Sequence, residues 1–484
     1  MQSIRYFSSD PVPLEMHKAR TVQKLNLAPI EDRKAAIEGA GGNTFLLRNK
    51  DIFLDMLSDS GVNAMSDLQV AAMARADDSY AGSESFFRMA EAVENMFGTR
   101  YLLPAHQGRA AEHILAQAFV KPKPDSTAIM NYHFTTTKAL ITFLGGKVEE
   151  IVIPEGLKVN SDHPFKGDMD LEKLAELTAE IGPENISFVR IEAGTNLIGG
   201  QPVSLGCLRA VSEFCHNHGL LFVFDASLLS DNLYFMAVRD PLCAGRELVD
   251  ITQEIGQLAD IIYFSARKLG CARGGAITTN RFDLYDQMRE FVPLFEGFLT
   301  YGGMSVREIE AIAVGLNEAL DFEVINQTPI FVAEFSRQLQ ARGIPVVTPP
   351  GGLGLHLDAK AFLPHLSQDR YPAGALAAAV FVAAGARGME RGTMSEQREP
   401  DGSERFAEME LLRLAIPKRV YTLSHITYVV DRLAWLWENR DLVGGLRYVE
   451  EPEVLRFFFG RLESDSDWMD RLVAAFRRDF GGSL

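Results

Sequence analysis

Short apolar runs alternate with helix-length amphipathic segments between about residues 85 and 300. The runs with the length and composition of buried strands are 100–105, 186–191, 220–225 and 260–265, and the run with a helical pattern is 110–120. Each predicted strand is followed by polar residues. Because a parallel sheet gathers such strand ends at the edge where ligands bind, we expect an α/β fold with a binding site at that edge.

Beyond about residue 310 the pattern changes to longer helices and mixed strands, which predicts a second domain. The expected organisation is an N-terminal segment that joins the small domain (1–55), a large domain (56–310), a small C-terminal domain (311–463) and a helical extension (464–484). The Ala-rich run 375–386 is too short to span a bilayer, so we expect a buried helix and no membrane partner. The charged stretch 395–403 has the composition of a linker.

Composition narrows the class of protein. The chain has 484 residues, of which 47% are apolar, and this is enough for a large globular core. Its 48 basic and 65 acidic residues give a net charge of −17, which argues against a nucleic-acid partner. The four cysteines lack the paired spacing of a metal centre, and the N-terminus lacks a signal-peptide pattern, so we expect a cytoplasmic protein.

Two residues at predicted strand ends, Asp225 and Lys268, indicate a specific cofactor. A lysine amine can hold the aldehyde of pyridoxal phosphate as a Schiff base, and an aspartate can keep the pyridine nitrogen protonated. Gln107-Gly108-Arg109 precedes the predicted helix and would present backbone N–H groups to a phosphate. Taken singly, the aspartate also fits a helix cap and the lysine a solvated surface residue. Together these residues favour a pyridoxal phosphate site.

Longer stretches carry a resemblance to a known family. They are Asn43-Thr44-Phe45-Leu46-Leu47, Asp59-Ser60-Gly61, Tyr80-Ala81-Gly82-Ser83-Glu84, His106-Gln107-Gly108-Arg109, Phe134-Thr135-Thr136-Thr137, Gly199-Gly200-Gln201-Pro202-Val203 and Ile416-Pro417-Lys418-Arg419-Val420-Tyr421. In order and spacing they resemble the tryptophanase and tyrosine phenol-lyase family of pyridoxal phosphate enzymes, and the resemblance covers nearly the whole chain. It implies a fold type I (aspartate aminotransferase-like) enzyme with a mostly parallel seven-stranded sheet, assembled as a homotetramer with shared active sites.

The resemblance also implies roles for individual residues. Cofactor binding falls to Gln107, Gly108, Arg109, Phe134, Asn196, Asp225, Ser265, Arg267 and Lys268. Binding of the amino acid substrate falls to Ser60, Thr135, Asn196, Met389, Arg391, Arg413 and Phe457. The implied catalytic residues are Lys268, Tyr80 and Arg391. Lys268 would be the base that removes the α-proton, and Tyr80 the acid that protonates the leaving ring. Arg413 would grip the substrate carboxylate.

Residues around Arg391 distinguish phenol from indole as the leaving group. Met389-Glu390-Arg391 resembles the phenol-lyases, in which the arginine faces the phenolic oxygen, with Thr135 placed to assist. Phe457 also matches them, because tryptophanases usually have histidine there. The resemblance therefore implies conversion of L-tyrosine and water to phenol, pyruvate and ammonia. The alternatives are a modified tyrosine or another β-substituted amino acid, tryptophan, and a weakly active structural or regulatory homologue.

The chain departs from the family pattern at three places. Leu228 stands where the family usually has an arginine beside the cofactor ring hydroxyl, so we expect a raised pKa for the imine of Lys268. In a shortened loop, Arg273 is placed to replace a monovalent cation such as potassium by pairing with Asp78, although an Arg273 that points to solvent fits equally well. Residues 464–480 extend past the usual family end and have the pattern of an amphipathic helix.

Overall fold

A sheet of seven strands forms the centre of the computed structural model, which describes residues 12–399 and 401–484. In spatial order the strands are β2 (Tyr101–Ala105), β8 (Gly275–Thr279), β7 (Ile261–Ser265), β6 (Phe222–Asp225), β5 (Ile186–Glu192), β3 (Thr127–Met130) and β4 (Lys147–Glu150). Within this sheet β8 runs antiparallel to both of its neighbours, and the other pairs are parallel. The expected seven-stranded, mostly parallel sheet is confirmed.

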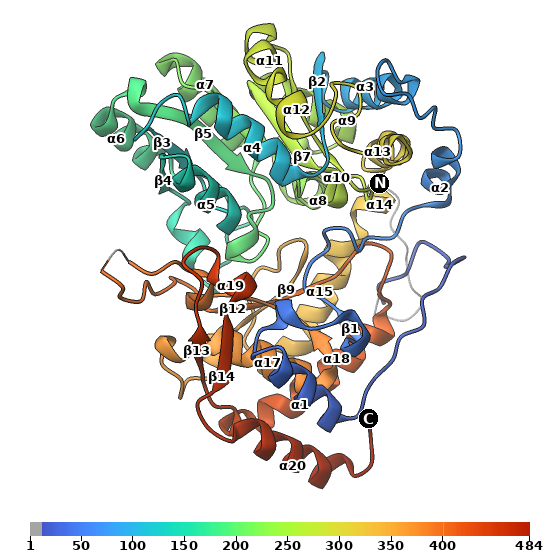
Figure 1. Ribbon diagram of the computed structural model, residues 1–484, viewed down its shortest axis with the longest axis vertical. Helices are drawn as coiled ribbons and strands as arrows, with labels where there is room; N and C mark the ends of the chain where they lie inside the picture. The colour runs from blue at the N-terminus through green and yellow to red at the C-terminus, as the bar shows by residue number, and fades with distance from the viewer. Residues whose placement is uncertain (1–11, 400) are drawn as a thin grey trace.

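Helices cover both faces of the sheet (Figure 1). Alternate residues of a strand point to opposite faces, so Phe222 and Phe224 of β6 enter one apolar cluster and Val223 enters another. The first face carries α3 (Glu84–Phe97), α6 (Leu171–Ile181), α7 (Leu205–His218), α8 (Leu229–Arg239), α9 (Leu248–Leu258) and α13 (Val306–Glu318); the second carries α4 (Gly108–Phe119), α5 (Thr135–Phe143), α11 (Phe282–Arg289) and α12 (Phe291–Phe295). Because both faces are covered, the inner strands are apolar along most of their length.

The ends of neighbouring strands deliver polar residues to one edge of the sheet. β5 ends at Glu192, β6 at Asp225 and β7 at Ser265, where the short helix α10 (Ala266–Leu269) begins. The predicted strands and the helix after Gln107 all form, with boundaries shifted by one or two residues. This edge is therefore the place at which the sequence predicted a binding site.

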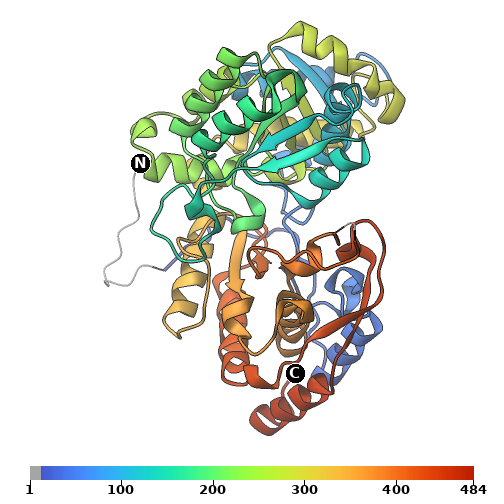
Figure 2. The ribbon, with the colours of Figure 1, turned by 90° about the vertical axis from the view of Figure 1, so that its left-hand side faces the viewer.

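The other half of the molecule is built around a smaller antiparallel sheet. It contains β11 (Met389–Arg391), β12 (Leu411–Ala415) and β9 (Gly354–Asp358), with α15 (Gln327–Gln340), α17 (Pro372–Ala384) and α18 (Leu423–Glu438) around them. The N-terminal α1 (Ile30–Gly39) packs on α17, and β1 (Leu54–Asp55) pairs with β10 (Ala386–Arg387). Figures 1 and 2 show the early segment lying beside the C-terminal part. The proposed domain boundaries stay a prediction, and residues 1–11 of the first lie outside the described part.

Two helices predicted from apolar patterns form. Every residue of α17 is buried, as expected for the Ala-rich run. Among the described residues, no helix is both long and apolar enough to cross a membrane. At the C-terminus, β13 (Leu446–Glu450) and β14 (Arg461–Ser464) make a hairpin, and α20 (Trp468–Phe480) follows. Trp468, Leu472 and Phe476 of α20 are buried, and the helix packs on α17 and α1 of its own chain.

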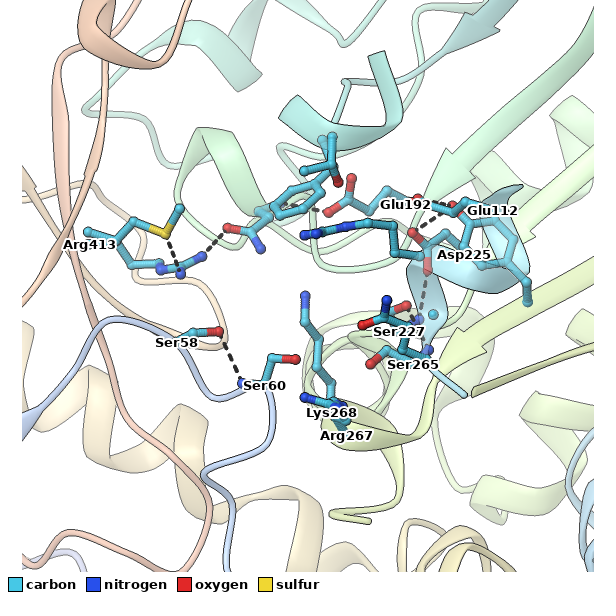
Figure 3. Close-up of a pocket in the computed structure, with 18 of the residues that line it drawn as sticks. Ser58, Ser60, Glu112, Glu192, Asp225, Ser227, Ser265, Arg267, Lys268 and Arg413 are labelled. Carbon is cyan, nitrogen blue, oxygen red and sulfur yellow. Dashed lines mark hydrogen bonds between the residues drawn. The ribbon is translucent and has the colours of Figure 1, made fainter. Parts of the chain in front are cut away.

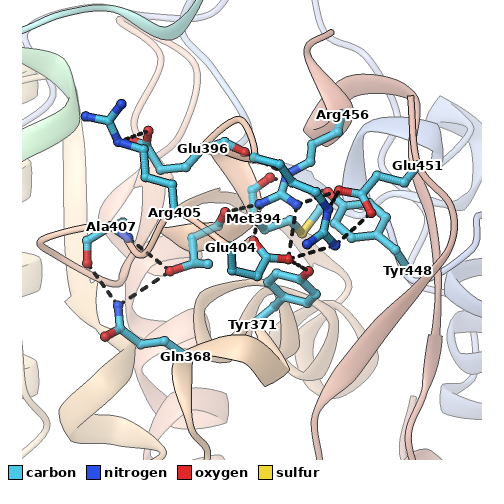
Figure 4. A network of polar contacts seen from close by, with 12 residues as sticks. Gln368, Tyr371, Met394, Glu396, Glu404, Arg405, Ala407, Tyr448, Glu451 and Arg456 are labelled. Atoms are coloured by element: carbon cyan, nitrogen blue, oxygen red, sulfur yellow. Dashed lines mark hydrogen bonds and ion pairs between the residues drawn. The ribbon is translucent and has the colours of Figure 1, made fainter. Parts of the chain in front are cut away.

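The buried side chain of Arg456 holds the long segment that connects β11 to β12 (Figure 4). Arg456, 1% exposed, donates to the carbonyls of Thr393 and Glu396 at 2.8 and 2.6 Å. It also pairs with Glu404 at 2.7 Å and Glu451 at 2.6 Å. The stretch 395–403 is therefore held to the domain by specific bonds, in contrast to the linker that its charged composition suggested; Pro400 lies outside the described residues.

We expect Arg456→Gln to lower the free energy of unfolding by about 3 kcal/mol, because it leaves buried acceptors without their donor. Arg398→Gln is the matched control: Arg398 pairs with the same carboxylates, Glu404 and Glu451, but its side chain is 36% exposed. Its loss should cost less than about 1 kcal/mol. Urea unfolding followed by circular dichroism measures both losses, and equal losses would contradict the anchoring role of Arg456.

Candidate active site

A cavity of about 200 Å³ lies where the carboxyl edge of the large sheet meets β11 and β12. The predicted site residues that line it are Ser60, Gln107, Gly108, Arg109, Phe134, Asn196, Asp225, Ser265, Arg267, Lys268, Met389, Arg391 and Arg413. Figure 3 shows Lys268 pointing into the cavity, with Arg413 on one side and Asp225 and Glu192 on the other. Residues that lie far apart in the sequence thus form one site.

One end of the cavity has the hydrogen-bond donors and positive charges that bind an anion. Helix α4 starts at Gly108 in the cavity wall, and Gln107 before it gives no side-chain cap, so the first backbone N–H groups remain available. Arg109 and Arg267 add two guanidinium groups. Burial lowers the pKa of Arg267, as do Arg273 and Arg109, and its buried Nε has no hydrogen-bond partner among the described residues. A phosphate would satisfy these donors.

The wall next to this end carries Asp225, the carboxylate that would pair with the pyridine nitrogen of the cofactor. Asp225 accepts hydrogen bonds from the backbone N–H of Ser227 at 2.9 Å, from the Tyr263 hydroxyl at 2.9 Å and from Arg190 Nη2 at 2.5 Å. These donors fix the carboxylate in its orientation. Phosphate donors, Asp225 and the amine of Lys268 are the groups that pyridoxal phosphate requires, so the residues present fit this cofactor.

Phe134 supplies a flat apolar surface between the reactive groups. It lies at the residue before α5, and its ring centroid is 5.4 Å from Lys268 Nζ and 5.4 Å from Arg391 Cζ. An aromatic ring in this place can stack on a flat cofactor and stabilise nearby cations. The position fits the stacking role that the resemblance implied.

Arg413 is a buried cation with a fixed orientation. Its Nη1 donates to Asn196 Oδ1 at 2.5 Å, and its Nη2 donates to the Leu57 carbonyl at 2.6 Å and to Met389 Sδ at 3.0 Å. Burial lowers the pKa of Arg413 to about 10, so the group stays charged at neutral pH. A guanidinium held in this way can bind a carboxylate.

Arg391 differs from Arg413 because it makes no hydrogen bond within the described chain, although its guanidinium lies over the Phe134 ring. It is 4% exposed and lines the cavity, and all three of its side-chain nitrogens are buried without a hydrogen bond in the described chain. Burial, and then repulsion from Arg413, lowers the pKa of Arg391. An unpaired buried guanidinium is costly, so this position requires an acceptor supplied by a ligand.

Three predicted site residues do not line the cavity of the single chain. Tyr80 is 70% exposed and lies against the rings of Phe298 and Tyr301. Thr135 and Phe457 are buried nearby, but their neighbours Thr136 and Phe458 line the wall instead. In each pair the residue that lines the cavity is one position further along the chain. Their proposed roles stay predictions.

Leu228 and Arg273, which depart from the family pattern, have defined neighbours in the structure. Leu228 is buried at 2% exposure beside Gly194, so it brings no cation to the site. The backbone N–H of Arg273 donates to Glu308 at 3.1 Å, and no ion pair joins Arg273 to Asp78 within residues 12–399 and 401–484. A pair between Arg273 and Asp78 therefore stays a prediction.

Sequence reasoning missed a cluster of charges in the cavity wall, formed by Arg190 with Asp225, Glu192 and Glu112. Arg190, 1% exposed, lies 2.5 Å from Asp225, 3.5 Å from Glu192 and 3.8 Å from Glu112, and its Nε donates to Tyr263 at 2.7 Å. A signal existed in the sequence, because Arg190 interrupts the mostly apolar predicted strand 186–191 and Glu192 directly follows it. Buried charges of this kind occur as paired groups. Here one arginine faces three carboxyl groups, and burial raises the pKa of Glu112 and of Glu192.

We expect Gly108→Ala to weaken pyridoxal phosphate binding at least about tenfold, a cost of about 1.4 kcal/mol. The new Cβ would lie 2.8 Å from Ser265 Cβ and 3.0 Å from its Cα, so the helix start and the end of β7 must separate. Gly206→Ala in α7 is the control, since its nearest neighbour would be 3.6 Å away. Fluorescence titration with the cofactor measures both, and unchanged affinity in Gly108→Ala would contradict the proposed phosphate site.

Comparisons with known proteins show the family of the chain. The chain matches the family model described as beta-eliminating lyase over residues 55–432. It is 40% identical over 454 residues to a tyrosine phenol-lyase of Intrasporangium calvum, with 94% of this chain and 96% of the relative covered. It is 39% identical over 453 residues to a tyrosine phenol-lyase of Pasteurella multocida, with 93% and 98% covered.

Solved structures with low sequence identity share the fold. An aspartate aminotransferase double mutant of Thermus thermophilus gives a TM-score of 0.58 at 15% identity, with 84% of this chain and 95% of that chain covered. A threonine aldolase of Leishmania major gives 0.56 at 16% identity, with 79% and 99% covered. The expected aspartate aminotransferase-like fold is confirmed. By its sequence over nearly its whole length, the chain belongs to the β-eliminating lyase family and is a pyridoxal phosphate-dependent lyase.

Proposed function

We propose that the enzyme converts L-tyrosine and water to phenol, pyruvate and ammonia. The observation that carries this proposal is the buried guanidinium of Arg391, which faces the cavity without a partner in the described chain. A phenolic oxygen is an acceptor that can satisfy it. The tyrosine phenol-lyases to which the chain is similar support the same leaving group.

The two buried arginines would orient the substrate along the cavity. Arg413 binds the carboxylate of the amino acid, in a position fixed by Asn196 and Met389. Arg391 lies on β11, and Arg413 lies opposite Met389 across β11 and β12. One strand pair therefore positions both ends of the substrate, which fixes the Cα–H bond relative to the base.

Lys268 is the residue that would move the proton at Cα. Bound pyridoxal phosphate supplies an electron sink for the carbon that loses this proton. The ε-amine of Lys268 points into the cavity near the Phe134 ring, within reach of a substrate held by Arg413. As a neutral amine it accepts the α-proton, and elimination of the ring carbon then needs a separate proton donor.

Tyr80 would supply that second proton from a neighbouring copy of the chain. Its ring is 70% exposed and stands outside the cavity of its own chain, in a patch with Phe298 and Tyr301. An exposed aromatic patch of this kind fits a subunit interface. We therefore keep the homotetramer with shared active sites as part of the proposal.

Indole is a poorer leaving group for this cavity. The indole nitrogen donates a hydrogen bond and has no acceptor for Arg391, so the guanidinium would stay unpaired. A modified tyrosine or another β-substituted amino acid is the second candidate, because Leu228 stands where the family resemblance implies an arginine beside the cofactor. Pairing of Arg273 with Asp78 in place of a monovalent cation would make activity independent of potassium.

We expect Arg391→Gln to lower kcat/KM for L-tyrosine at least about 100-fold, because it removes a charged hydrogen bond worth up to about 3 kcal/mol. The same variant should keep pyruvate release from S-methyl-L-cysteine within about threefold, since a small leaving group has no oxygen to present to residue 391. Arg398→Gln, outside the cavity, controls for a general effect of losing an arginine. Equal losses on both substrates would contradict recognition of the phenol oxygen by Arg391.

We expect Tyr80→Phe and Lys268→Ala to be inactive on L-tyrosine when each is purified alone. Coexpression of the two chains should restore roughly a quarter of the sites, because hybrid dimers combine one intact lysine and one intact tyrosine. Phenol release measures the recovery, with a Tyr80→Phe, Lys268→Ala double variant coexpressed with Lys268→Ala as control. No recovery in verified hybrids would place Tyr80 in the site of its own chain or outside the mechanism.

A further inference from the structure

Glu192 occupies a position equivalent to that of Asp225 on the neighbouring strand. The two residues are paired in the register of β5 and β6, and each ends its strand. Residues paired across parallel strands direct their side chains to the same face of the sheet. Both carboxyl groups line the cavity, and Figure 3 shows them side by side.

Only one of the two carboxyl oxygens of Glu192 accepts a hydrogen bond within the described chain. Its Oε1 accepts the backbone N–H of Asn196 at 3.2 Å, in the same residue whose side chain holds Arg413. Its Oε2 is buried and makes no hydrogen bond within the described chain, although it lies 3.5 Å from Arg190 Nη2. With the residue 4% exposed, a bound group is the natural source of the missing contact.

The charged and titratable groups around Glu192 come from several elements. Those that interact with it are Arg190 on β5, Asp225 on β6, Lys268 on α10, Arg391 on β11 and Arg413 on β12. Behind them, Tyr263 on β7 and Glu112 on α4 contact Arg190, and His356 on β9 lies near Arg391 and Arg413. Arg190 lies 1 Å closer to Asp225 than to Glu192, at 2.5 against 3.5 Å. Arg190 therefore neutralises the charge of Asp225 more than that of Glu192, and Glu192 can interact with groups in the cavity.

We propose that Glu192 is a second cofactor-facing carboxyl, which acts beside Asp225 to control the protonation of bound pyridoxal phosphate. Leu228 brings no cation to this region, so no cation at position 228 offsets the charge of Glu192. A carboxylate stabilises a nearby protonated group and disfavours its neutral form. The proposal rests on the cofactor site and is independent of whether tyrosine is the substrate.

The ionisation of Glu192 makes this control dependent on pH. Burial raises the pKa of Glu192 to about 7, against the opposing effects of Arg190 and Lys268. The group is therefore a carboxylate above about pH 7 and becomes neutral below it. In its charged form it raises the pKa of a cationic group on the bound cofactor, so its removal lowers that pKa.

The test is a pH titration of the visible absorption of the cofactor-loaded enzyme. Glu192→Gln keeps the shape of the side chain and an oxygen for Asn196, but loses the charge. We expect its absorption midpoint to fall by about one pH unit relative to the unchanged enzyme. Asp168→Asn is the matched control, because burial raises the pKa of Asp168 to about 7 as well. Asp168 lies outside the cavity, where it accepts a hydrogen bond from the backbone N–H of Ser204 before α7. Its midpoint should not move.

The outcomes distinguish the role of Glu192 from the existence of the pyridoxal phosphate site on which it rests. A midpoint unchanged in Glu192→Gln, with a normal cofactor spectrum, overturns the role of Glu192. Absence of any cofactor band in the unchanged enzyme counts instead against the cofactor site itself. If Glu192→Gln does not fold, Glu192→Asp decides, because it withdraws the charge by one methylene. A smaller downward shift supports the proposal, and an unchanged midpoint overturns it.

Discussion

The cost of burying positive charge is the constraint on which the site depends. None of the three buried side-chain nitrogens of Arg391 has a hydrogen-bond partner in the described chain, and Arg267 lacks one at its Nε. Arg413 and Arg190 each leave one nitrogen unpaired but donate to internal acceptors with the others. A buried cation without a partner destabilises a protein by several kcal/mol. The fold tolerates these groups because a cavity joins them, so a ligand can bring the missing acceptors: a phosphate at one end and a phenolic oxygen at the other.

The scaffold explains why these groups can be held so firmly. The large sheet fixes Asp225 and Glu192 through paired strands buried on both faces, and the start of α4 stands directly against Ser265. The small antiparallel sheet fixes Arg391 and Arg413 through the register of β11 with β12. The segment that joins these two strands is anchored by Arg456 (Figure 4). The chemistry thus lies on rigid elements, which preserves geometry when the substrate binds.

Much of this arrangement could be predicted from the sequence, because the signals were local. Alternating apolar runs predicted the parallel sheet, and Asp225 and Lys268 stood at strand ends where ligands bind. The cluster of Arg190, Glu192 and Glu112 could not be assembled from local patterns, because the three come together only through strand pairing and the packing of α4.

Side-chain direction and assembly limited prediction elsewhere. Phe457 and Phe458 are adjacent and equally apolar, and only the path of the chain shows that Phe458 lines the cavity. Tyr80 belongs to a clear motif, yet it lies outside the cavity of its own chain. Its proposed role depends on subunit contacts that neither a local sequence pattern nor a single chain contains.

The most direct measurement of the central claim compares two ligands that differ by one hydroxyl. Both 3-(4-hydroxyphenyl)propanoate and 3-phenylpropanoate offer a carboxylate to Arg413, but only the first offers an oxygen to Arg391. Their dissociation constants for the cofactor-loaded enzyme can be obtained by calorimetry. If the unpaired guanidinium defines the site, the hydroxylated ligand binds at least about tenfold more tightly, a difference of about 1.4 kcal/mol. Equal dissociation constants would contradict the assignment of Arg391 to a phenolic oxygen.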